Sequence, residues 1–580
     1  MWLKLMEETA HSIRYNGRVW LLSMLYVQIQ YPSVLKSKLI KRRSWGGIIL
    51  PMNAAWRKAT ILMIFTGMLL SACGNDLWGT SAQNVTPTLE KTSIPTPDAS
   101  PINRLIPSSI PQATPTDWPT STEQPTITAM PATVTMMSGT MQSSTVYLSQ
   151  SGDTLQAVAL HFGVKVSEIT SIMDLPTTGL LNPNTPLVIP NRLGQEAITP
   201  STQIIPDSEV VYSASAVGFD FAGYIHTAGG KLSTYSEAYS SILSTGSDDI
   251  QRMAFGSSIS PRILLALIEY YTGWVLGPGN AGVDKTYPLG YHDPDYTGLY
   301  QQMRLLVREL LAGYYGWRGG TVTELTFPDG SKLRLAPDLN AGTVALEYLF
   351  SRHLNQTEWL QAIDPNTGFP KLFSSMFGDP WERAQIYGPL FPPDLTQPAL
   401  TLPFEPNTLW SLTGGPHPAW EQESAWAALD FAPAMSKSGC VESDAWVIAV
   451  APGEIVRSDA GYVVLDLDRD GFEETGWDVL YLHIATKDRI PVGRFVNAGD
   501  HIGHPSCEGG EATGTHVHIA RKYNGEWVAA GDPLPFVMSG WTAHAGDAPY
   551  KGTLTKEGEQ TVTANQTASG NSHIIRKPGE

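Results

Sequence analysis

The sequence predicts a multidomain chain with a small α/β module, an all-α region and a C-terminal all-β antiparallel sandwich or barrel. Three patterns support this prediction: a strand–helix–helix–strand order in residues 145–192, long helical apolar periods in residues 210–400, and short alternating strands with Gly and Asp turns in residues 405–540. With 580 residues, the chain is also too long for one domain.

The charge of the chain is negative and unevenly spread. The formal net charge is −17, although residues 1–60 carry a net +8 and the rest therefore carries −25. The folded parts are thus acidic, which argues against nucleic acid as a partner.

Residues 52–73, "MNAAWRKATILMIFTGMLLSAC", have the layout of a secretory signal, with a basic start, an apolar run and small residues before a cysteine. The apolar run has about ten residues, against about 20 for a membrane span. The ending "LSAC" resembles the lipobox of bacterial lipoproteins. This resemblance implies lipidation of Cys73 and an extracytoplasmic protein anchored to the cell membrane that reaches into the wall. Residues 1–51 are interpreted as a mis-assigned start; an unusually long basic leader is the alternative.

Residues 74–144 are rich in Thr, Pro and Ser and have few charges. Such a composition cannot bury enough apolar surface to offset the entropy of ordering, so we expect a disordered, extended tether.

Residues 145–192 are expected to form a compact module, with Asp153 or Thr154 capping a first helix and Ser167 capping a second. The motifs "GDTL", "FGV" and "LVIP" make the segment resemble a LysM domain, which implies binding of N-acetylglucosamine-containing glycans such as peptidoglycan. One departure is "SIMDLP", because the family usually has Asn near Asp174. A linker is expected at residues 193–209.

In residues 210–400 we expect helices over 260–275, 296–320 and 340–354. Their order faintly resembles the lysozyme-like fold of lytic transglycosylases, but Tyr271 and Thr272 stand where that family has its Glu-Ser pair. Glu269 lies about 200° away around a helix. We therefore expect a degenerate, non-catalytic domain. Glu269 as a displaced acid, which would cleave glycan, and a packing domain without glycan contact are the alternatives.

The C-terminal region contains "THVHIA", in which His516 and His518 point to the same side of a strand, about 7 Å apart along the backbone. A catalytic zinc ion takes about three protein ligands and keeps one position open. Further donors are available in His417, Asp430 and His483.

Together with "LDFAP", "APGEIV" and "VNAGDHIGH", these residues resemble the lysostaphin/LytM-type zinc metallopeptidases. The resemblance implies Zn²⁺ on His417, Asp430 and His518, with His483 and His516 acting on the water and the oxyanion. It also implies cleavage of a peptide bond in peptidoglycan. A catalytically silent wall-binding protein that activates or regulates other hydrolases is the alternative.

One departure concerns spacing, since twelve residues separate His417 from Asp430 where the family usually has three. We expect an inserted loop whose ends still converge.

Two smaller features lie in the same region. Because three cysteines are present, at least one is unpaired or modified, and Cys440 and Cys507 are expected to form a disulfide in the exported domain. Asp466, Asp468 and Asp470 precede Gly471 like the start of a calcium loop, although Trp477 takes the position of the last acidic ligand. Calcium and a plain acidic turn both remain open.

Residues 541–580 read as a polar tail, disordered or at most an edge strand.

Overall fold

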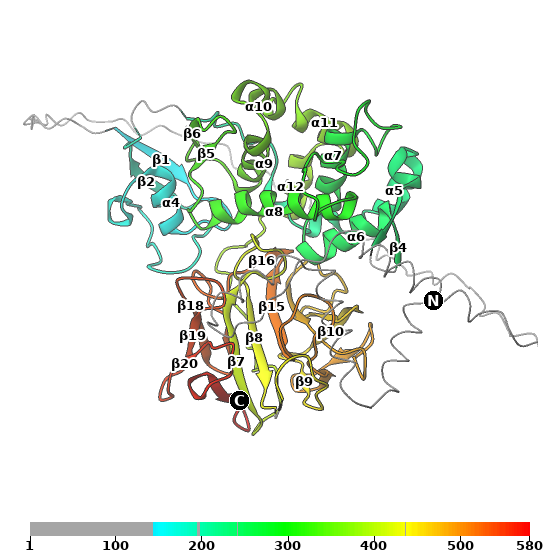
Figure 1. Cartoon of the computed structure of the whole chain (residues 1–580). Coiled ribbons are helices and arrows are strands. Elements are labelled where there is room, and N and C mark those ends of the chain that lie inside the picture. Colours follow the sequence, from blue (N-terminus) through cyan, green and yellow to red (C-terminus); the bar gives the residue numbers. More distant parts are fainter. Residues whose placement is uncertain (1–142, 194–197, 240–241, 436) are drawn as a thin grey trace, which may run out of the picture. The chain divides into compact units, whose positions relative to one another are not determined.

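The computed structural model describes residues 143–193, 198–239, 242–435 and 437–580, all within one compact unit that runs to Glu580 (Figure 1). The predicted signal segment, Cys73 and nearly all of the tether lie outside the described residues. Within the described part of the chain, no helix has the length and apolar character that crossing a membrane requires.

The first module pairs β1 (Ser144–Leu148) with β2 (Pro186–Pro190) as antiparallel strands, with α4 (Leu155–Phe162) between them. Thr154 caps α4 as expected, because its hydroxyl accepts a hydrogen bond from the Ala157 N–H, and Gly163 ends the helix at φ 64°. The expected second helix is only a single 3₁₀ turn, Val166–Glu168.

The second module is a helical bundle whose three predicted helices are all present. It is built from α5 (Phe221–Ala228), α6 (Gly246–Ser257), α7 (Pro261–Thr272), α8 (Leu299–Arg318), α9 (Ala341–His353), α10 (Gln356–Ile363), α11 (Phe369–Phe377) and α12 (Pro380–Tyr387). The buried faces of α7, α8 and α9 form the centre of one large core. Pro261 at the start of α7 and Gly273 just after its last residue define the two ends of that helix.

The module differs from the all-α expectation in two ways. Two short hairpins interrupt the helices: β3 (Ser236–Tyr239) with β4 (Ile242–Thr245), and β5 (Glu324–Thr326) with β6 (Lys332–Arg334). The module also begins before residue 210, because Ile204 and Ile205 from the expected linker are buried in its core.

The third module is built on a long antiparallel sheet with the strand order β13-β10-β11-β12-β15-β8-β7-β21, and β16 pairs with β15. Its strands are β7 (Leu409–His417), β8 (Ala428–Pro433), β10 (Gly453–Asp459), β11 (Tyr462–Asp466), β12 (Trp477–Leu482), β13 (Phe495–Val496), β15 (Val517–Tyr523), β16 (Glu526–Trp527) and β21 (His573–Ile575). A small pair, β9 (Val447–Ile448) and β14 (His501–Gly503), lies beside it.

The C-terminal tail is largely folded, which corrects the expectation of a disordered tail. A second sheet, with the order β17-β18-β19-β20, packs against β7. Its strands are β17 (Val537–Met538), β18 (Trp541–Ala545), β19 (Gly552–Thr555) and β20 (Val562–Thr563). Each strand buries only one or two apolar side chains, such as Leu554 and Val562. The composition of the tail is therefore mostly polar, although the tail is folded. In the described structure, β20 and β21 each end a sheet and so match the alternative of an edge strand.

Arg318, at the end of α8, contacts all three modules. Its guanidinium donates to both carboxylate oxygens of Glu526 on β16, each at 2.9 Å, and to Asp207 in the helical module at 2.9 Å. It also donates to the Ser151 carbonyl of the first module. The first module adds a stacked pair, His161 on Trp317, with ring centroids 3.5 Å apart.

Candidate metal centre

His417, Asp430 and His518 come together on three neighbouring strands, β7, β8 and β15. His518 stands directly opposite Asp430 in the sheet register. The three potential donor atoms form a small triangle: His417 Nε2 lies 3.0 Å from His518 Nδ1 and 3.3 Å from Asp430 Oδ1, and His518 Nδ1 lies 3.2 Å from Asp430 Oδ1. All three residues are buried.

The glycines before His417 explain how β7 reaches this triangle. The β7–β8 register shifts between Leu412 and Gly414 and again between Gly414 and His417. Gly414 is paired with Asp430, and a Cβ at Gly414 would come within 2.5 Å of Asp430 Oδ2. Only glycine leaves room for the carboxylate here, in line with the use of strand glycines where groups approach closely.

Backbone carbonyls orient both rings of the triangle. His417 Nδ1 lies 2.7 Å from the Gly415 carbonyl and His518 Nε2 lies 2.9 Å from the Ala419 carbonyl, so these nitrogens carry the proton and donate it. The remaining nitrogens, His417 Nε2 and His518 Nδ1, then point lone pairs at each other and at Asp430. This second layer of hydrogen bonds is typical of histidines that bind metals.

The arrangement fits a cation. Two lone pairs and a carboxylate oxygen repel one another at about 3 Å, and Asp430 Oδ1 is buried without a hydrogen bond in the described structure. Donor atoms held tetrahedrally at about 2.0–2.2 Å from zinc lie about 3.3 Å apart, close to the observed triangle.

The other two predicted residues lie beside the triangle. His516 Nε2 is 3.7 Å from Asp430 Oδ1, and the His483 and His516 rings are 4.5 Å apart. Their Nδ1 atoms lie 2.8 Å and 2.7 Å from the carbonyls of Glu508 and Gly514, which leaves both Nε2 lone pairs available. Burial, reinforced by His516 and His518, lowers the pKa of His483 to about 3, so this ring is neutral at neutral pH.

The expected insertion between His417 and Asp430 is a closed loop, residues 418–427, between β7 and β8. Its base is held by the Ala419 N–H, which donates to the Ala425 carbonyl at 3.0 Å. The tip binds the helical module, because Arg304 donates to Glu421 at 3.0 Å and Arg308 to Gln422 at 2.7 Å.

Sequence reasoning missed one residue at the site, Tyr550, which lies in the segment expected to be a tail. Its ring stacks on His417 with centroids 4.1 Å apart, and its backbone N–H and carbonyl bond to Pro416 and Gly415. Burial, with the charges of Asp430 and Glu511, raises the pKa of Tyr550, so its phenol stays protonated. No pattern near Tyr550 signals this position.

Comparisons with known proteins find similarity to a protease. A family model described as "LasA, N-terminal domain" matches residues 203–392. Protease LasA from Pseudomonas aeruginosa is 25% identical over 355 residues, which cover 58% of this chain and 78% of that protein. These matches agree with the resemblance to the lysostaphin/LytM-type peptidases.

Two solved structures share this likeness at a lower level. Pseudoalterin, an M23 metalloprotease from the deep sea, is 21% identical, with 29% of this chain and 96% of that chain covered and a TM-score of 0.24. The catalytic domain of lysostaphin from Staphylococcus simulans is 23% identical, with 21% and 90% covered and a TM-score of 0.16.

The helical module falls within the range that matches the family model described as "LasA, N-terminal domain". Glu269, the alternative glycan-cleaving acid, has a structural role: its carboxylate accepts hydrogen bonds from the Val275 and Leu276 N–H groups, each at 2.9 Å, and so closes the turn after α7. Tyr271 is packed among aromatic rings.

The third module contains the expected disulfide, Cys440–Cys507, with Cα atoms 5.7 Å apart. The three aspartates of the predicted calcium motif, Asp466, Asp468 and Asp470, lie together in the turn between β11 and β12.

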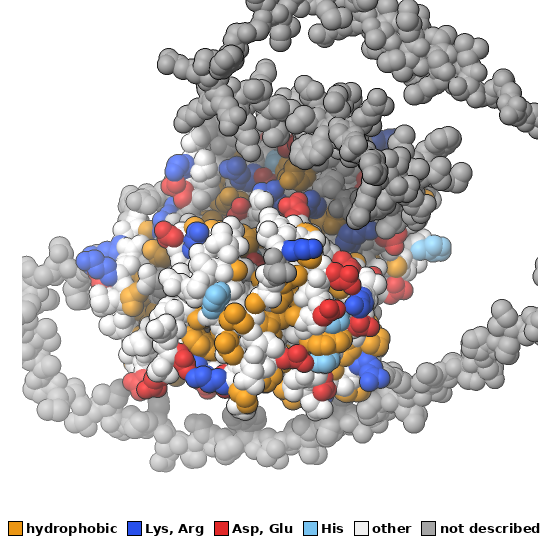
Figure 2. Space-filling model, turned by 60° about the horizontal axis from the view of Figure 1, so that its bottom comes forward, with side chains coloured by type: hydrophobic (Ala, Val, Ile, Leu, Met, Phe, Trp, Pro, Cys, Tyr) orange, Lys and Arg blue, Asp and Glu red, His pale blue; other side chains and the backbone are white. Residues whose placement is uncertain are grey.

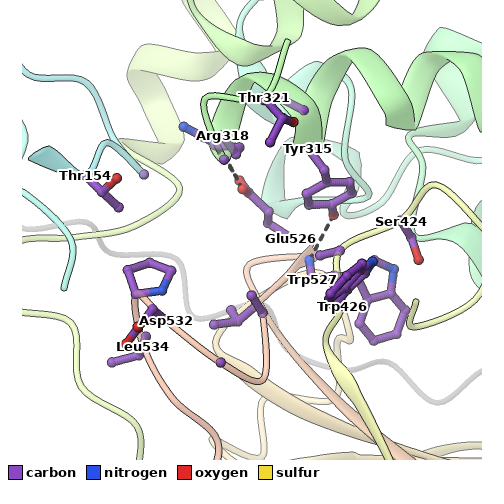
Figure 3. Close-up of a pocket in the computed structure, with 18 of the residues that line it drawn as sticks. Thr154, Tyr315, Arg318, Thr321, Ser424, Trp426, Glu526, Trp527, Asp532 and Leu534 are labelled. Atoms are coloured by element: carbon purple, nitrogen blue, oxygen red, sulfur yellow. Dashed lines mark hydrogen bonds and ion pairs between the residues drawn. The ribbon is translucent and has the colours of Figure 1, made fainter. Parts of the chain in front are cut away.

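A cavity of about 520 Å³ lies between the three modules and does not include the histidine–aspartate cluster (Figure 3). Its wall includes Thr154 of the first module, Tyr315 of α8, and Trp426 and Asp532 of the third module. Residues 422–426 of the inserted loop form one side, so the loop separates this cavity from the metal centre. On the face seen in Figure 2, apolar side chains gather among charges of both signs.

Proposed function

We propose that the chain is an exported zinc-dependent endopeptidase that cleaves peptide bonds in peptidoglycan. The triangle of His417, Asp430 and His518 carries this proposal, because its donor atoms, spacing and burial suit one zinc ion. The likeness to Protease LasA supports a peptidase. We extend to this chain the peptidoglycan substrate that the lysostaphin/LytM-type resemblance implies.

When bound, zinc would lower the pKa of a water molecule and polarise the scissile carbonyl. The chain's own residues supply the proton chemistry. We assign His516 as the proton acceptor, because its free Nε2 lies beside Asp430 at the edge of the triangle and its side chain is the more exposed of the two outer rings. Neutral His483, packed against His516, orients this ring.

Tyr550 is assigned as the donor for the developing oxyanion. Its half-exposed ring stands over His417, and its protonated phenol can donate a hydrogen bond where negative charge appears.

The first module is proposed to bind glycan in the manner of LysM domains and so to concentrate the peptidase on the wall. The signal segment and Cys73 are proposed to place the protein outside the cytoplasm on a lipid anchor. Both assignments follow from their sequence motifs.

The test combines metal analysis with product analysis on purified protein. We expect about one zinc per chain, and new amino ends from peptidoglycan that disappear by at least about 1,000-fold in Asp430→Asn and His518→Ala, since several kcal/mol of transition-state stabilisation would be lost. The exposed His573→Ala is the matched control and should keep full activity.

Two results would contradict the proposal. Zinc-free protein that binds peptidoglycan without releasing amino ends would identify a silent regulator. New reducing sugar ends would assign glycan cleavage to the helical module.

A further inference from the structure

The turn between β11 and β12 holds a cluster of carboxylates that the proposed peptidase does not use. Asp466 ends β11, and Asp468 and Asp470 follow in the turn. One oxygen from each carboxylate can be chosen so that all three lie within 4.8 Å of one another. Calcium binds oxygens at about 2.3–2.6 Å, so two ligands on opposite sides of one ion lie about 5 Å apart. The spread of these oxygens suits a single calcium ion.

The backbone of the turn has the form that such a loop requires. Gly471, at the sixth position counted from Asp466, has a φ of 86°, which favours glycine. Asp466 Oδ1 accepts hydrogen bonds from the N–H groups of Asp468 and Arg469, both at 3.0 Å, and Asp466 Oδ2 accepts one from the Gly471 N–H at 2.9 Å. These three bonds orient the carboxylate and leave about one of its four acceptor positions for a cation.

An independent observation comes from Asp478, at the thirteenth position. It stands directly opposite Asp466 in the β11–β12 pairing, so the two side chains share one face of the sheet. Asp478 is fully buried, and neither of its carboxylate oxygens accepts a hydrogen bond in the described structure. The neighbouring Lys522 does not satisfy it, since its ammonium donates to Glu473 at 3.0 Å. A buried carboxylate without a partner is costly, and a cation beside it removes that cost.

We propose that this turn binds one calcium ion. Asp466, Asp468 and Asp470 are its direct carboxylate ligands, and Asp478 supplies the fourth negative charge in place of the acidic residue missing at Trp477. Magnesium fits less well, because it requires a tight octahedron at about 2.0–2.1 Å.

The site would stiffen the hairpin that carries His483. Strand β12 ends at Leu482, one residue before this histidine, and it pairs with β11 from Asp478 to Leu482. Calcium bound at one end of the hairpin would therefore hold the strand that positions His483 at the other.

The experiment is a calcium titration by calorimetry on the full chain, after weakly bound cations have been removed and the zinc has been kept. We expect one calcium per chain with a dissociation constant between about 1 μM and 1 mM. Affinity should fall at least about tenfold in Asp468→Asn and in Asp478→Asn, because each loses a full negative charge. The exposed Asp444→Asn is the control and should bind like the parent protein. No binding heat up to 5 mM calcium, or unchanged affinity in both variants, would overturn the proposal.

A second measurement needs no variant. Arg469 is exposed in the turn, so trypsin should cut there at least about tenfold more slowly with calcium than with an equal concentration of magnesium. Equal cleavage rates would also overturn the proposal. Neither measurement depends on peptide hydrolysis, so failure here leaves the peptidase assignment standing.

Discussion

Two buried clusters of charged side chains, one around Arg318 and one around Asp430, are built on opposite principles. Glu526 accepts hydrogen bonds from Arg318 Nε and Nη2 and from the Tyr314 hydroxyl, so its charge is neutralised and its oxygens are satisfied. Asp430 Oδ1 faces three ring nitrogens and accepts no hydrogen bond from any of them.

This difference distinguishes a cluster that stabilises the fold from a cluster that can bind a ligand. A cluster closed by its own side chains has no place for a ligand and holds modules together. A cluster whose lone pairs converge on one point could hold a cation, which is why we propose a functional site there.

The largest effect on stability is expected from Arg318→Met. This change leaves the buried Glu526 carboxylate without its cation, which should lower the free energy of unfolding by about 3–5 kcal/mol. Chemical denaturation measures the loss, while the zinc content should stay unchanged. The exposed pair Lys332–Glu324 supplies the control, since Lys332→Met should cost less than about 1 kcal/mol. A loss of zinc in Arg318→Met would show that the two clusters are not independent.

Gly414→Ala tests the cluster around Asp430 without changing any of the proposed metal ligands. The new Cβ would lie 2.5 Å from Asp430 Oδ2 and should push the carboxylate out of the triangle. We expect zinc affinity to fall about 10–100-fold, as when a group that orients a metal ligand is lost. Competition with a chelator measures this affinity. Gly277→Ala is the matched control, because its Cβ would meet only an ordinary contact at 3.5 Å. Equal zinc affinity in both variants would disprove the close-packing argument.

The smallest expected effect is a loss of folding stability at low pH, caused by a histidine at the contact between the first module and α8. Burial lowers the pKa of His161 to about 3, against about 6.5 in the unfolded chain. Between these values the unfolded state binds more protons, so stability is complete above about pH 6.5 and declines as the pH falls towards 3. At pH 5 the loss should be about 2 kcal/mol.

Denaturation of the parent and His161→Gln at pH 5 and pH 7.5 measures this contribution. Glutamine can still donate to the Trp317 carbonyl but does not titrate. An identical acid response in the two proteins would place the titration elsewhere.

The sequence predicted that His417, Asp430 and His518 lie together, because a strand places alternate residues on one face and because the histidines occur in specific motifs. It gave no hint of Tyr550, whose position depends on tertiary pairing with β7. The glycine pair before His417 did carry a signal, since strand glycines mark bulges and close contacts.

The fold was predictable where apolar periods are long, as in α7, α8 and α9. It was not predictable in the tail, where β19 and β20 are short and each buries a single apolar residue in a core made by distant strands. Likewise, the segment after Val166 forms only a 3₁₀ turn, because Thr170 pairs with the distant Val188 of β2 just after it.

The inserted loop of residues 418–427 has a mechanical consequence. Its base offers the Ala419 carbonyl that fixes the ring of His518, while its tip is gripped by Arg304 and Arg308 of α8. The loop therefore connects the helical module to the ring of His518. A shift of the helical module along the sheet would move the Ala419 carbonyl and so change the orientation of that imidazole.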